Sequence, residues 1–193
     1  MPKIILATTS SHRKAAFAFL GIPFEAEDSK IDESQEKRNN PEELVKKLSR
    51  LKAEAVARNH QDAIVIGMDS VGWFNNQILE KTQSKEEAFQ RIKFLSGNSL
   101  QFYTGVFMID TASNESLSKV VKTKVFLREI PEMEINKYLD EGQDFRNYAL
   151  GYDPLEHSSS AFVKRIEGSY NNLTRGVPLE EIVEMLRKIG YKE

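Results

Sequence analysis

Asp69 is the acidic residue whose place in the sequence most strongly suggests chemistry. A run of apolar residues from Ala63 to Met68, with three β-branched residues in a row at 64–66, stops at this carboxylate. Such a run is typical of a strand buried on both faces, and open α/β sheets bind ligands at the carboxyl ends of their strands. We therefore predict that Asp69 lies at or just past the end of a central strand, where an unpaired carboxylate would be costly without a function.

Glu33 is the second carboxylate with a candidate role, and it stands in an acid-rich segment over residues 25–36. Mg²⁺ in proteins is usually held by one or two carboxylates together with phosphate oxygens and water. Glu33 and Asp69 are therefore candidate metal ligands. For Glu33 the alternative is a plain solvated charge on a loop.

A polar turn follows the first apolar run and contains Ser10, His12 and Arg13. Where a strand turns into a helix, backbone N–H groups and the positive end of the helix dipole favour phosphate, and an arginine adds a bidentate donor. The turn is thus a candidate phosphate site. The alternative is that Ser10 only caps the helix and that the two basic residues are solvated.

Two lysines complete the candidate set. Lys52 borders the apolar stripe of a predicted helix, and Lys81 follows a predicted hairpin. Each also fits a surface lysine whose stem covers apolar neighbours. The glycines form neither a Walker loop nor a G-x-G-x-x-G fingerprint, so the P-loop and dinucleotide-binding classes are excluded.

Composition narrows the classes further. The 193 residues contain no cysteine, which excludes disulfides, zinc–thiolate sites and cysteine nucleophiles. A net charge of −2 provides no broad basic surface for a nucleic-acid polymer, and no apolar stretch reaches the length of a membrane span. We expect a cytoplasmic protein that forms one domain over residues 1–193.

The elements that must position these residues alternate between strand and helix patterns. Asn40 before Pro41 marks the start of a helix, and Asn75–Asn76 suits a tight turn because asparagine tolerates a positive φ. The predicted elements are a strand over 3–8, helices over 14–20 and 41–59, the strand that carries Asp69, a hairpin over 71–79, a helix over 84–96, strands over 99–110 and 117–130, a helix over 131–141, a strand over 161–166 and a helix over 178–189.

Four ordered blocks of sequence resemble the Maf family of nucleoside triphosphate pyrophosphatases, and together they span nearly the whole chain. They are L-A-T-T-S-S-H-R at 6–13; I-G-M-D-S-V-G at 66–72 with I-L-E-K-T at 78–82; L-S-G at 95–97 with Y-T-G-V at 103–106; and F-V-K-R-I-E-G-S-Y-N at 162–171 with G-V-P-L at 176–179.

The resemblance implies a mixed α/β fold shared with inosine triphosphate pyrophosphatases, in which helices flank an elongated twisted sheet and a cleft separates two lobes. It implies hydrolysis of a nucleoside triphosphate between the α and β phosphates, with Mg²⁺ or Mn²⁺ as cofactor. A pyrimidine or modified nucleotide is the expected substrate, and a homodimer is the expected assembly.

The resemblance also implies roles for particular residues. Ser10, His12 and Arg13 would bind phosphate oxygens, Lys52 and Lys81 would neutralise the leaving pyrophosphate, and Glu156 would contact the nucleotide base. Glu33 and Asp69 would bind the metal ion and its water. Asp69 has an alternative role as the general base on that water, and the sequence leaves both roles open.

Several positions depart from the family pattern. His12 replaces an arginine, Ala15 a glutamate and Glu156 a glutamine, and the segment that contains Arg175 is one residue longer. The loss of a permanent cation at His12 and of the expected glutamate at Ala15 supports an alternative function, a catalytically weakened relative that binds nucleotide or a protein partner and regulates growth or division. A third alternative, an RNA-binding module, would need a basic aromatic surface that the composition does not supply.

Overall fold

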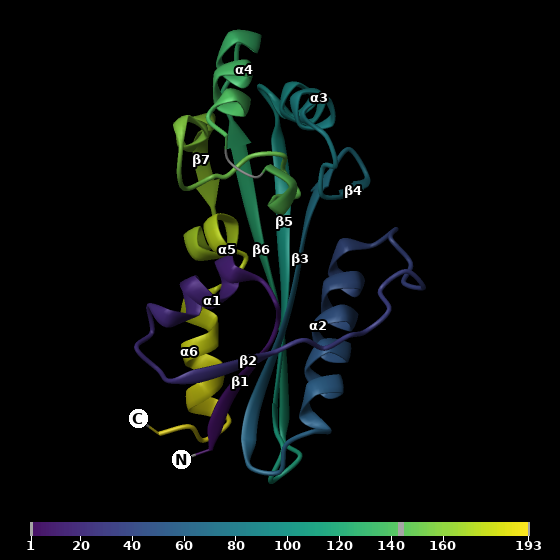
Figure 1. Cartoon of the computed structure of the whole chain (residues 1–193), viewed down its shortest axis with the longest axis vertical. Coiled ribbons are helices and arrows are strands. Elements are labelled where there is room, and N and C mark those ends of the chain that lie inside the picture. The colour runs from purple at the N-terminus through teal and green to yellow at the C-terminus, as the bar shows by residue number, and fades with distance from the viewer. Residues whose placement is uncertain (1, 143–144, 193) are drawn as a thin grey trace.

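The structure is a computed structural model that describes residues 2–142 and 145–192. It contains a seven-stranded mixed sheet with helices on both faces (Figure 1). The strands are β1 (Lys3–Ala7), β2 (Phe24–Glu27), β3 (Ala63–Phe74), β4 (Gln77–Leu79), β5 (Ser99–Asp110), β6 (Ser116–Leu127) and β7 (Val163–Glu167). The helices are α1 (Ser11–Ala18), α2 (Pro41–Ala57), α3 (Lys85–Leu95), α4 (Glu132–Asp140), α5 (Tyr170–Arg175) and α6 (Leu179–Lys188), with short 3₁₀ turns at Phe145–Asn147 and Ser158–Phe162.

The long strands β3, β5 and β6 form the spine of an elongated molecule, and both termini lie at its lower end in Figure 1. The order is β2-β1-β3-β5-β6-β7, and β4 pairs with β3. The β1 strand is parallel to β2 and β3, whereas the β3–β4, β3–β5, β5–β6 and β6–β7 pairs are antiparallel. The predicted mixed α/β sheet flanked by helices is therefore confirmed.

The position predicted for Asp69 at the end of its strand is wrong. β3 continues for five residues beyond Asp69, which pairs with Gly105 in the middle of the β3–β5 ladder. The strand that ends near Asp69 is β1, whose last pair with β3 is Ala7 with Gly67. On the same edge, the pairing of β3 with β4 begins only at Gly72. On that edge of β3, residues 68–71 therefore pair with no strand among the described residues. This gap in the ladder leaves an open sheet edge beside Asp69, whereas the sequence argument placed such an edge at the end of the strand.

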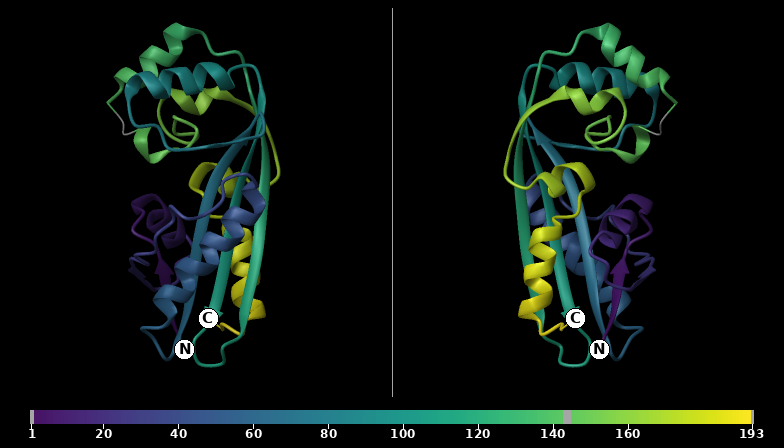
Figure 2. Two further views of the ribbon diagram at one scale, coloured as in Figure 1. Left: turned by 90° about the vertical axis from the view of Figure 1, so that its right-hand side faces the viewer. Right: turned by 90° about the vertical axis from the view of Figure 1, so that its left-hand side faces the viewer.

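Helices cover the sheet from both sides (Figures 1 and 2). On one face, α1 and α6 pack on Ile64, Ile66 and Met68 of β3 near the termini, and α3 and α4 pack on the far ends of β5 and β6. On the other face lies α2, whose Ala53 and Val56 contact Val65. No helix among the described residues has both the length and the apolar character to cross a lipid bilayer.

The structure changes several predicted boundaries. The α1 helix begins at Ser11 rather than at residue 14, because Ser10 caps it directly after the turn. In α2 the buried positions include Val45, Ser49 and Ala53, so the face that packs on the sheet is rotated from the predicted leucine stripe. The β6 strand ends at Leu127, before the predicted residue 130, β7 covers 163–167 rather than 161–166, and α5 was not predicted.

Candidate active site

A cavity of about 420 Å³ opens at the gap in the β3 ladder. Seven of the eight predicted site residues line it, although they come from five separate parts of the chain: Ser10, His12, Arg13, Glu33, Lys52, Asp69 and Lys81. Residues from both faces of β3 reach this space because, in the described part of the chain, no strand pairs with β3 at residues 68–71. The cavity therefore contains the Asp69 carboxylate, which faces α2, together with Arg13 of α1 and Arg175 of α5 from the opposite face of the sheet.

Arg13 closes part of the open β3 edge. Its guanidinium donates to the carbonyl oxygen of Met68 at 2.9 Å and to Ser70 Oγ at 3.1 Å. Burial lowers the pKa of Arg13, and the charges of Asp69 and Glu33 partly oppose this shift. The Ser10 hydroxyl accepts from the Arg13 backbone N–H at 3.3 Å, so the capping role weighed for Ser10 is present in the structure.

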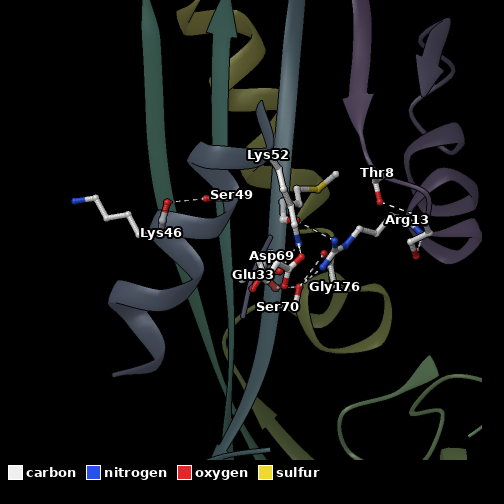
Figure 3. A network of polar contacts seen from close by, with 12 residues as sticks. Thr8, Arg13, Glu33, Lys46, Ser49, Lys52, Asp69, Ser70 and Gly176 are labelled. Atoms are coloured by element: carbon white, nitrogen blue, oxygen red, sulfur yellow. Dashed lines mark hydrogen bonds and ion pairs between the residues drawn. The ribbon is translucent and has the colours of Figure 1, made fainter. Parts of the chain in front are cut away.

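Lys52 lies between the two predicted acidic residues (Figure 3). Its Nζ is 2.6 Å from Asp69 Oδ1 and 2.9 Å from Glu33 Oε1. The Lys52 and Asp69 side chains are only 13% and 10% exposed, whereas Glu33 is 39% exposed. Two carboxylates separated by a long stretch of sequence thus converge on one ammonium at the cavity wall.

Two glycines on the sheet allow α2 to place Lys52 there. A Cβ on Gly105 would lie 2.1 Å from the carbonyl oxygen of Val45, and one on Gly67 would lie 2.1 Å from that of Ser49. No side chain fits at either position, so the α2 backbone rests directly on the strands. Since Gly105 is paired with Asp69, this close approach brings the lysine of α2 to the carboxylate.

The opposite face of β3 is joined to the C-terminal helices through Ser70. Its hydroxyl lies 2.8 Å from Thr104 Oγ1 and 3.4 Å from the carbonyl oxygen of Gly176. Gly176 ends α5 in the left-handed conformation, with φ of 62°. The chain just after α5 is therefore held against the residue that follows Asp69.

Other cavity residues were not predicted as site residues. Arg38 forms an ion pair with Glu80 at 2.7 Å, and Arg175 places its guanidinium 4.5 Å from the ring centroid of Phe19. The ring of Tyr148 lies 5.2 Å from that of His12, centroid to centroid. The sequence contained one signal for this group, the extra residue in the segment of Arg175.

Glu156 is the predicted site residue that does not line the cavity. It is exposed, and one of its oxygens lies within 4.8 Å of ligand atoms of Asp153 and His157. The Asp153 carboxylate already accepts hydrogen bonds from the Tyr148 hydroxyl at 2.9 Å and from the Leu155 N–H at 2.8 Å. This acidic group is therefore separate from the carboxylates that face Lys52.

A family model described as Maf-like protein matches residues 3–189. The chain belongs to this family. It is 35% identical to a dTTP/UTP pyrophosphatase from Pelotomaculum thermopropionicum, with 99% of this chain and 98% of the relative covered. It is 33% identical to a 7-methyl-GTP pyrophosphatase from Nitrosococcus oceani, over 98% and 94%, and 35% identical to a nucleoside triphosphate pyrophosphatase from a Synechococcus strain, over 99% and 96%.

Among solved structures, the Staphylococcus aureus Ham1 protein resembles this Maf-like chain with a TM-score of 0.56. The match covers 96% of this chain and 98% of the Ham1 chain, with 15% sequence identity, so it supports the fold alone. The family predicted from the four sequence blocks is confirmed.

The donor set of this Maf-like site fits a hard divalent cation. Glu33 and Asp69 point oxygen atoms at one positively charged group, the Lys52 ammonium, and the cavity beside them has room for phosphate oxygens. Two carboxylates with phosphate and water are the usual ligands of Mg²⁺. The chemistry of the carboxylates thus suits Mg²⁺ or Mn²⁺.

Proposed function

We propose that this Maf-like protein hydrolyses nucleoside triphosphates to the monophosphate and pyrophosphate. The observation that carries the proposal is the convergence of Lys52, Asp69 and Glu33 at the wall of a cavity that also contains Arg13 and Lys81. A pair of carboxylates suits a metal ion and its water, and the cations suit a polyphosphate. The names of the three relatives support the same reaction.

In the proposed reaction, water attacks the α phosphorus, the bond from that phosphorus to the bridging oxygen breaks, and pyrophosphate leaves with the bridging oxygen. Arg13 and the N-terminus of α1, capped by Ser10, orient the phosphates. Lys52 and Lys81 stabilise the negative charge that develops on the leaving group. A bound Mg²⁺ or Mn²⁺ would supply Lewis-acid activation of phosphate and water, held by Glu33 and Asp69.

We propose one domain of two lobes over residues 1–193, a homodimeric assembly and a cytoplasmic location. The substrate is proposed to be a pyrimidine or modified nucleoside triphosphate. Glu156 is proposed to contact the base, and because a carboxylate only accepts hydrogen bonds, it would favour a base edge that donates them.

The test is product analysis with purified protein, Mg²⁺ or Mn²⁺ and a panel of canonical, methylated and deaminated nucleoside triphosphates. In water labelled with ¹⁸O, attack at the α phosphorus places the label in the monophosphate, whereas attack at the β phosphorus places it in pyrophosphate. We expect label in the monophosphate. Phosphate and a diphosphate as products would contradict the proposal.

Asp69→Asn tests the site itself. We expect a loss of at least about 100-fold in kcat with a folded protein, whether Asp69 binds the metal ion or acts as the general base. The matched control is Asp62→Asn, an exposed acid just before the same strand, which should keep full activity. Full activity of Asp69→Asn would remove Asp69 from the mechanism.

The alternative function, a nucleotide-binding regulator with weakened catalysis, has one observation in its favour: His12 lines the cavity at the position where the family resemblance implies an arginine. Nucleotide binding without turnover across the whole panel would favour it over the enzyme.

A further inference from the structure

Arg175 occupies an unusual position in the cavity. It is the last residue of α5, and it lines the cavity while its guanidinium rests 4.5 Å from the ring centroid of Phe19. The Phe19 side chain is 67% exposed. A cation stacked on an exposed ring gains little, so this contact holds Arg175 only weakly.

The other arginines of the cavity already use part of their guanidinium groups in bonds to the protein. Arg13 donates to Met68 and Ser70, and Arg38 pairs with Glu80. Lys52 bridges the two carboxylates. Among the described residues, three lysine or arginine side chains of the cavity form no ion pair with a carboxylate: Arg13, Lys81 and Arg175. Of these, Arg13 is hydrogen-bonded to Met68 and Ser70 instead.

The backbone that carries Arg175 is firmly attached to the sheet beside the acidic residues. Asn172 is fully buried and donates through Nδ2 to the carbonyl oxygens of Phe102 and Val121, at 3.3 and 3.2 Å. On the other side of Arg175, Gly176 contacts Ser70, the residue after Asp69. A long flexible side chain thus projects from a fixed support next to the candidate catalytic carboxylate.

We propose that Arg175 is a phosphate-binding residue that leaves the ring of Phe19 and binds the polyphosphate of the nucleotide. The inference rests on the proposed function and adds to it a residue from the segment that is one residue longer than the family pattern. A guanidinium matches two phosphate oxygens with parallel hydrogen bonds, so rotation about side-chain bonds is sufficient and α5 need not move. Arg175 thereby replaces the permanent positive charge that His12 does not provide.

The first experiment measures binding of inorganic triphosphate, in parallel with KM and kcat for the best nucleotide. We expect Arg175→Gln to raise the Kd and the KM about tenfold, which is typical of a lost charged hydrogen bond. Arg175→Lys should keep part of the affinity because it retains the charge but not the bidentate geometry. The matched control is Arg187→Gln, an exposed arginine in the last turn of α6, which should change neither constant.

Phe19→Leu separates a binding role from a structural one. If the ring is only a resting place for Arg175, its loss frees the guanidinium, and the Kd for triphosphate should stay the same or fall, by up to about fivefold. If the stack of Arg175 on Phe19 is purely structural, Phe19→Leu should weaken binding as Arg175→Gln does, and the inference is overturned. The inference is also overturned if Arg175→Gln changes neither the Kd for triphosphate nor the KM while its melting temperature shows that the protein is folded.

The two proposals can fail separately. Arg175-dependent binding of triphosphate by a protein that hydrolyses no nucleotide would contradict the enzyme and support the role of Arg175. If the protein hydrolyses nucleotide and Arg175→Gln changes neither KM nor kcat, the enzymatic function is supported and the role of Arg175 is contradicted.

Discussion

Lys52 holds Asp69 and Glu33 together through a single ammonium group, at 2.6 and 2.9 Å. The three residues belong to α2, β3 and the loop before α2, so the contact links the helix to the sheet at the edge of the cavity. Two carboxylates that contact the same ammonium group would repel one another without that positive charge. The lysine thus serves both the fold and the proposed site.

Lys52→Met is expected to lower the free energy of unfolding by about 2–3 kcal/mol, because it leaves two adjacent carboxylates without their counter-charge while the apolar stem is preserved. Urea unfolding measures the loss. Lys47→Met on the same helix is the control, since Lys47 is 60% exposed and its pair with Glu36 should contribute less than about 1 kcal/mol.

Mg²⁺ should raise the melting temperature of Lys52→Met more than that of the wild type, because the ion would neutralise the same carboxylates. An equal shift in the two proteins would contradict metal binding at Glu33 and Asp69.

Gly105→Ala tests whether the contact between α2 and the sheet positions Lys52. The new Cβ would lie 2.1 Å from the Val45 carbonyl oxygen, so α2 must move away. We expect a loss of about 3 kcal/mol in stability and a larger proportional loss of kcat/KM. Gly21→Ala is the control: φ there is +71° and no atom lies within 4 Å, so it should show only the left-handed backbone cost of about 1–2 kcal/mol and normal kcat/KM. Full activity of a folded Gly105→Ala protein would show that Lys52 tolerates movement of α2.

Local sequence patterns predicted most elements because they depend on nearby residues. Asn40 does cap α2, accepting from the N–H groups of Glu42 and Glu43, and Asn75–Asn76 does form the tight turn with positive φ at both residues. The α5 helix escaped prediction because it has only six residues and owes its position to Asn172, whose partners lie on β5 and β6. Such distant hydrogen bonds leave no local pattern.

The candidate site was predictable in its residue types and not in its geometry. An apolar run ending at Asp69 indicated a buried carboxylate, and the Asp69 side chain is only 10% exposed. The sequence could not show that β3 continues past this residue while β1 stops at Ala7, because that depends on how two strands of different length pair. Arg38 gave no sequence signal, since its place in the cavity follows from the fold of an irregular loop.

Ser113→Ala should reveal a pH-dependent contribution to stability far from the cavity. Hydrogen bonds from the Ser113 side chain and then from the Ala112 backbone lower the pKa of Asp110 below its ordinary value of 3.8. A lowered pKa stabilises the fold above the unfolded value, and the contribution disappears as the pH falls through the folded value. The variant should thus be less stable at pH 7, by under about 1 kcal/mol, with a smaller difference near pH 2.

Unfolding free energies measured from pH 2 to pH 7 test this directly. Ser118→Ala, an exposed serine on the neighbouring strand, should show no such pH dependence. A Ser113→Ala difference that stays constant over the whole range would mean that the effect comes from other contacts of Ser113, such as its acceptance of the Glu115 N–H, and not from Asp110.

His12→Arg should strengthen nucleotide binding. His12 is exposed, lines the cavity and lies against the Tyr148 ring, so an arginine there has both room and an aromatic face to stack on. An arginine supplies a permanent charge and a bidentate donor for phosphate oxygens. We expect KM to fall about threefold to tenfold. His157→Arg, outside the cavity lining, should leave KM unchanged. If His12→Arg also leaves KM unchanged, the phosphates do not reach the first turn of α1, and Arg13 must then act through Met68 and Ser70 as a structural residue.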